Sequence, residues 1–168
     1  MGGWADVARR VHQELTRMEI AHDFTARLAR RQGWDNIYAQ KVDREYRRFL
    51  MIAWVSKNMV VPSDAVDAAW HEHILHTRHY SEILPRILGR ALHHEPGSAD
   101  GSQNDEHLAG YRRTLEIYRI LYGKPPPEEV WPKPAVKRGF FEKIGISRKH
   151  KNADDGTAAL ISIAISDD

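Results

Sequence analysis

The fold follows most directly from residues 61–76, which read VPSDAVDAAWHEHILH. Pro62 favours an extended chain just before it, and Ser63 is a preferred N-cap whose side-chain oxygen can accept a backbone N–H of the first helical turn. Asp64 then places a negative charge where the helix dipole stabilises one. These residues predict a helix that begins after Ser63 and ends near His76.

Apolar residues recur at helical spacing on both sides of this segment and predict further helices. The expected helices cover about residues 6–31, 35–57, 63–76 with a continuation to 88, and 105–122. Pro85 should kink the continuation or restart it, and Gly123 is suited to the C′ position that ends the last helix. The sequence therefore predicts an all-α fold, a small helical bundle of about four to six helices.

A proline-rich segment at residues 124–134 follows the last expected helix. Its prolines require a largely extended chain, so we expect a strap across the helices with Trp131 as its anchor. Such segments also bind partners at a low entropic cost, and we expect a protein partner to contact 124–134 and the tail. We assign residues 1–132 to one helical domain and residues 133–168 to a basic, then apolar, C-terminal tail that is poorly ordered.

Composition limits the classes of function. The chain has 168 residues, a formal net charge of +2 and 42% hydrophobic residues, which fits one soluble domain. It contains no cysteine. That absence excludes disulfides, iron–sulfur clusters, thiolate zinc sites and a cysteine nucleophile. No apolar run approaches the roughly 18 residues of a membrane span, and we expect a cytoplasmic protein.

Histidine is concentrated in one region, because six of the ten histidines lie between residues 71 and 94. Asp67 and His71 are four residues apart and share a helix face, whereas His73 lies about 200° around the helix from His71. An antiparallel return of the chain could bring His94 beside Asp67 and His71. Imidazole and carboxylate ligands suit Zn²⁺ or Fe²⁺. Asp67, His71 and His94 are therefore candidate ligands of a divalent ion, and His73 is a fourth if the helix is distorted.

The same cluster can be interpreted in three ways: as structural hydrogen bonds between helices, as a metal or ligand site, or as catalytic groups. The zinc-protease pattern His-Glu-x-x-His begins at His71 and fails at Leu75. The sequence contains no other established catalytic motif, which favours a binding role over an enzymatic one. Arginines at 27–31 and 44–48 could contact phosphates, but the near-neutral total charge argues against nucleic-acid binding.

Residues 61–73, Tyr80 and residues 89–94 match a pattern of the form V-P-x-x-x-[IV]-D-x-x-W-H-x-H, then Tyr, then G-x-x-L-x-H. This pattern resembles the hallmark of the glycine-rich domain-containing protein-like family. Residues 111–132 are also similar to bacterial-type members, and the resemblance covers roughly residues 40–132.

The resemblance implies an α-helical domain with no settled biochemical activity. The polar hallmark positions fall on Asp67, Trp70, His71, His73, Tyr80 and His94. The chain does not end in the glycine- and cysteine-rich sequence expected of some relatives, so a function located in such a tail is not carried over. We interpret the chain as a helical binding or interaction module whose buried Asp-Trp-His-x-His centre is mainly structural. The alternative is a divalent-metal-binding protein, which could be hydrolytic, that uses Asp67, His71 and His94.

Overall fold

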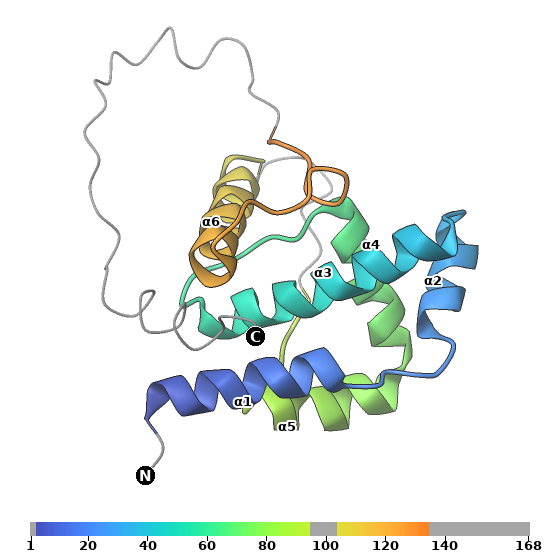
Figure 1. The fold of residues 1–168 in the computed structure, drawn as a ribbon, viewed down its shortest axis with the longest axis horizontal. Helices are drawn as coiled ribbons and strands as arrows, with labels where there is room; N and C mark the ends of the chain where they lie inside the picture. Colours follow the sequence, from blue (N-terminus) through green and yellow to red (C-terminus); the bar gives the residue numbers. More distant parts are fainter. Residues whose placement is uncertain (1–2, 95–103, 135–168) are drawn as a thin grey trace, which may run out of the picture.

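The computed structural model describes residues 3–94 and 104–134, which form a bundle of helices without a strand (Figure 1). The elements are α1 (Trp4–Arg17), α2 (Phe24–Gln32), α3 (Asn36–Val55), α4 (Asp64–Leu75), the π-helical turn η1 (His79–Ile83), α5 (Leu84–Leu88) and α6 (Asn104–Tyr122). The predicted all-α fold is confirmed. None of these helices combines the length and the apolar composition that a membrane crossing requires.

Helix α3 is the centre of the bundle because it packs against α1, α2, α4 and α6. Figure 1 shows it crossing the molecule between α1 on one side and α6 on the other. Asp35 caps its N-terminus by accepting a hydrogen bond from the backbone N–H of Tyr38 at 2.8 Å. Large side chains on several of its faces are fully buried, namely Tyr46, Phe49, Leu50, Met51 and Ile52. Four helices are therefore positioned by their contacts with α3.

The single helix predicted over residues 6–31 is wrong, because α1 and α2 are separate helices. Met18 and Ile20 are both buried. Residues two apart lie about 200° apart on a continuous helix and cannot both face one core. The break is stabilised by Arg47, whose Nη1 donates hydrogen bonds to the backbone oxygens of Leu15 and Met18. These bonds satisfy carbonyl groups that the end of α1 leaves without a helical partner.

The chain after α4 turns back on itself and returns to the beginning of that helix. Ser63 caps α4 as predicted and accepts the Val66 backbone N–H at 3.3 Å. Pro85 lies in the first turn of α5, where the predicted kink or restart falls, and α5 follows η1 with Ile83 and Leu84 both in helical conformation. Gly89 then ends α5 with φ at +69°, a left-handed conformation in which other residues are strained. Residues 90–94 run from this turn toward the N-terminal half of α4.

The proline-rich strap covers the bundle, as predicted. Trp131 is 2% exposed, and its Nε1 donates to Oε2 of the buried Glu45 at 2.9 Å. The hydroxyl groups of Tyr38 and Tyr111 donate to backbone oxygens of Glu129 and Pro132. Trp131 is thus an anchor within this molecule. The predicted tail, residues 133–168, lies outside the described residues except for its first two positions.

Candidate functional site

Helix α4 carries most of the predicted motif and divides it between two faces. Trp70 and His73 are buried, whereas Asp67 is half-buried and His71 is exposed. The expectation of a buried centre is therefore correct for Trp70 and His73 and wrong for His71. The division follows from helical geometry, which places residues i and i+4 on one side and residues i and i+2 on nearly opposite sides.

On the core side, His73 lies in a chain of short polar contacts. Its Nδ1 is 2.7 Å from the Tyr46 hydroxyl, and its Nε2 is 2.7 Å from Nδ1 of His79. Burial, together with the neighbouring His79, His76 and Arg47, lowers the pKa of His73 to about 3. A neutral His73 can accept a hydrogen bond from Tyr46 and donate one to His79. Both ring nitrogens are therefore engaged in holding α3, α4 and η1 together.

Trp70 holds the returning chain against α4. Its Nε1 donates to the hydroxyl group of Tyr80 at 2.8 Å, and that hydroxyl group donates to the backbone oxygen of Leu92 at 2.8 Å. Burial raises the pKa of Tyr80, so the hydroxyl group stays protonated and can make both bonds. These two contacts fix the segment that carries His94. The hallmark residues Trp70 and Tyr80 thus act as supports.

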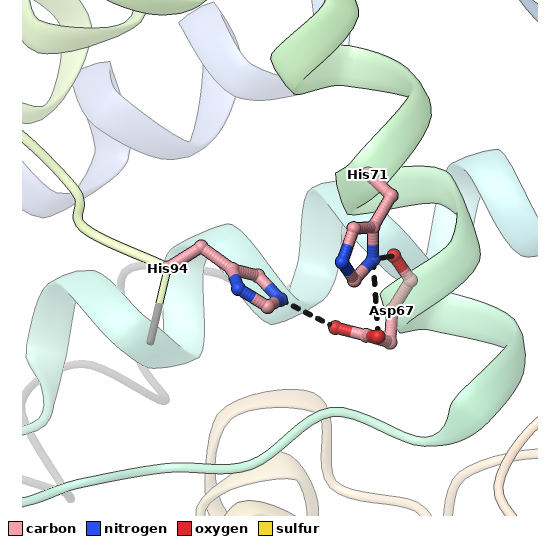
Figure 2. Close-up of side chains that lie close together, drawn as sticks. All are labelled: Asp67, His71 and His94. Atoms are coloured by element: carbon pink, nitrogen blue, oxygen red, sulfur yellow. Dashed lines mark hydrogen bonds and ion pairs between the residues drawn. The ribbon is translucent and has the colours of Figure 1, made fainter. Parts of the chain in front are cut away.

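On the other face, Asp67, His71 and His94 come together (Figure 2). His94 Nε2 donates to Asp67 Oδ1 at 2.8 Å, and His71 Nδ1 lies 3.1 Å from Asp67 Oδ2. His71 Nδ1 also donates to the backbone oxygen of Asp67 at 2.8 Å. The two imidazole rings meet edge-on with their centroids 4.4 Å apart. The carboxylate is therefore approached by one imidazole from its own helix and by another from the segment after α5.

The donor atoms of this group are close enough to share one metal ion. One ligand atom from each residue lies within 4.8 Å of the other two. Nitrogen and oxygen ligands at 2.0–2.2 Å from an ion lie about 3–3.5 Å from one another, so small side-chain rotations would complete the geometry. The contacts to Asp67 are now made through protons on His71 and His94, and a bound ion would replace such protons. The structure places His73 apart from this group, on the opposite face of α4.

A cleft of about 610 Å³ lies over the three residues. It is bordered by the end of α3, the segment 56–62, the beginning of α4, the segment 90–94 and His107 near the start of α6. Lys57 and Arg90 line it together with the carboxylates of Asp64 and Asp67. The candidate ligands are therefore accessible from a cavity of the size that holds small molecules.

Two parts of this site carried no signal in the sequence. His79 belongs to a run of histidines in which nothing distinguishes it, and its contact with His73 depends on the π-helical turn η1. Lys57 stands in no motif, and Arg90 occupies a variable position of the residue 89–94 pattern. Arg90 reaches the cleft because the chain returns past the end of α3. The anchoring contact here is between Arg90 Nη2 and the backbone oxygen of Ala53, at 2.7 Å.

Comparisons with known proteins support the resemblance that the motif predicts. The UCP032817-like family model matches residues 11–120, which include the whole of the Asp67, His71 and His94 group. Glycine-rich domain-containing protein 1 of Arabidopsis thaliana is 24% identical over 121 residues, which cover 69% of this chain and 14% of that protein. Glycine-rich domain-containing protein 2 of the same plant is 23% identical over 125 residues, which cover 71% of this chain and 15% of that protein.

The chain spans about one seventh of the length of these plant relatives. The similarity therefore concerns one segment of much longer proteins. No solved structure matches the chain. The chemistry of the site must accordingly be argued from its own geometry.

Proposed function

This chain belongs to the UCP032817-like family, and we propose that it is a helical binding module that holds one divalent metal ion with Asp67, His71 and His94. The buried residues Trp70 and His73 support the fold in this proposal. The cleft-side residues bind the ion. The bacterial-type membership indicated by residues 111–132 and a cytoplasmic location remain predictions beside it.

The observation that carries the proposal is the convergence of two imidazoles on one carboxylate at an accessible surface. The side chain of His71 is 56% exposed and that of Asp67 is 34% exposed. A buried structural histidine is hydrogen-bonded at its ring nitrogens, as His73 is in this protein. An exposed histidine gains little stability from such a contact, since surface ion pairs contribute about 0–1 kcal/mol. The stability of the fold therefore gives little reason for His71 to approach Asp67, whereas a shared metal ion would account for it.

The donor set favours Zn²⁺ or Fe²⁺. Two imidazole nitrogens, which are borderline ligands, and one carboxylate oxygen, which is a hard ligand, suit both ions, and three protein ligands leave coordination positions for water. An ion held in this way lowers the pKa of its bound water, which is the property that hydrolytic metal sites use. Hydrolysis is therefore the reaction class to test once an ion is bound.

The test is a metal analysis of the full chain purified without a histidine tag. Elemental analysis and calorimetric titration with Zn²⁺, or with Fe²⁺ under anaerobic conditions, should give one ion per chain. His71→Ala and His94→Ala should each abolish stoichiometric binding. His93→Ala is the matched control, because His93 is the exposed neighbour of His94 and is absent from the ligand group.

A loss of metal binding in a variant must be distinguished from a loss of its fold. Circular dichroism and a urea titration of each variant should show that the helices remain intact. If the unmodified chain binds substoichiometric amounts of both ions and its melting temperature does not rise on their addition, the proposal is wrong. Equal loss of binding in His93→Ala would also overturn the assignment of ligands.

A further inference from the structure

We infer that the cleft beside the Asp67–His71–His94 group binds a small organic anion, a phosphate or carboxylate with an apolar body, through the open positions of the ion and through Arg90. This inference rests on the proposed metal site and deepens it by naming the class of ligand. The observations that carry it are the charges that line the cleft, the way Arg90 is held, and the apolar residues that also line the cleft.

Charge is the first observation. Lys57 and Arg90 line the cleft with two carboxylates, Asp64 and Asp67, so the formal charges of these four side chains cancel before an ion enters. A divalent ion adds two positive charges, and the loaded cleft then has a positive excess. Electrostatic attraction is strengthened in a recess bordered by low-dielectric protein. A loaded site of this kind selects an anion over a neutral or cationic molecule.

The second observation is the arrangement of Arg90. Its Nη2 donates to the backbone oxygen of Ala53, near the C-terminal end of α3, at 2.7 Å. Arg90 makes no other hydrogen bond to the described residues, although a guanidinium group has five N–H donors. The contact orients the planar group and leaves donors that suit the paired oxygens of a phosphate or carboxylate. Lys57, which is exposed at the same end of α3, adds a second positive charge.

The third observation is the apolar part of the cleft. Phe49, Val61, Trp70 and Leu92 contribute to its lining. The cavity of about 610 Å³ exceeds what an inorganic ion needs and falls within the range of small-molecule sites. We therefore expect a ligand whose anionic head binds the ion and Arg90 and whose apolar or aromatic body packs on these apolar residues.

The inference is tested by calorimetry on the full chain, first loaded with Zn²⁺ and then stripped with a chelator. The probes are inorganic phosphate, phenyl phosphate and benzoate, which separate the charge of the head from the contribution of the body. We expect phenyl phosphate or benzoate to bind the loaded protein more tightly than inorganic phosphate does. We expect binding of each probe to weaken strongly in the stripped protein and to weaken with added salt.

Two substitutions identify the cationic groups. Lys57→Gln should weaken anion binding about two- to fivefold, which is the contribution of an exposed charge. Arg90→Lys, which keeps the charge and loses the fork of donors, should weaken it about tenfold. Zn²⁺ affinity should be unchanged in both. Arg86→Gln is the matched control, because Arg86 is exposed on α5 and does not line the cleft.

The outcomes distinguish the two proposals. A protein that binds one Zn²⁺ and then binds none of the three probes overturns the anion site and leaves the metal site standing. Probe binding that is unchanged by Lys57→Gln and Arg90→Lys also overturns it. A protein that binds no ion overturns the metal site, and the anion site as written falls with it.

Discussion

Asp67 Oδ1 and His94 Nε2 lie 2.8 Å apart although the two residues are 27 positions apart in the chain. The carboxylate lies in the first half of α4, and the imidazole follows the left-handed turn at Gly89. Tyr80 links the two regions, because its hydroxyl group bonds both Trp70 and the backbone of Leu92. Trp70 and Tyr80, two other hallmark residues, therefore hold in place the segment that brings His94 to Asp67.

Replacing the shared carboxylate should remove the ion and preserve the fold. Asp67→Asn keeps the shape of the side chain and removes the charge that both imidazoles contact. We expect Zn²⁺ affinity to fall by more than about 100-fold, since even substitutions outside the ligand shell cost 10–100-fold in metal sites. Calorimetric titration measures the change. Asp64→Asn, in the same cleft but outside the ligand group, should retain the affinity of the unmodified protein.

Stability should fall with decreasing pH because His73 is buried in its neutral form. Its pKa is about 3 in the folded protein and about 6.5 when unfolded, so the unfolded chain binds more protons between these values. The free energy of unfolding should therefore decrease as the pH falls from about 6.5 toward 3, with His73 contributing at most about 1.4 kcal/mol per pH unit.

Urea denaturation at a series of pH values, with a chelator present, measures this slope. His73→Gln should be less stable at neutral pH and should show a shallower slope over the same interval. His93→Gln should keep the slope of the unmodified protein. An unchanged slope in His73→Gln would show that other groups cause the pH dependence.

The buried carboxylate of Glu45 should be essential for docking the strap. Its oxygens accept hydrogen bonds from Arg48 at 2.8 Å, from Tyr118 at 3.3 Å and from Trp131 at 2.9 Å. Glu45→Gln removes the charge and turns one acceptor into a donor, so we expect a loss of about 2–4 kcal/mol. Urea denaturation followed by tryptophan fluorescence measures it. Glu129→Gln alters an exposed pair with Lys41 and should change stability by less than about 1 kcal/mol.

The contact between α6 and the edge of the cleft requires a residue without a side chain at position 110. A Cβ atom on Gly110 would lie 2.7 Å from Cγ2 of Val61. We expect Gly110→Ala to destabilise the protein by about 1–3 kcal/mol through overpacking. In the Val61→Ala background this collision is removed, and the higher helix propensity of alanine should make the same change neutral or stabilising. A double-mutant cycle on unfolding free energies tests this, and additive effects would contradict it.

Local sequence was sufficient for most of the helices and for two of the three residues of the candidate metal site. The Ser63 cap, the position of Pro85 and the helical periodicity predicted elements that the structure contains, because these signals act over a few residues. Asp67 and His71 were expected together for the same reason, since residues i and i+4 are neighbours on any regular helix. The helix predicted over 6–31 failed because burial of both Met18 and Ile20 overrides local periodicity.

Long-range packing supplied the rest. His94 was a candidate only if the chain returned, and that return requires the Gly89 turn and the Tyr80 contacts to act at once. Packing also assigned opposite roles to two histidines of one motif: His73 is enclosed by α3 and η1, whereas His71 is left at the surface. Helical periodicity in a sequence predicts which side chains share a helix face. Which face is covered depends on the elements that pack against it, and here that difference separates a structural histidine from a candidate ligand.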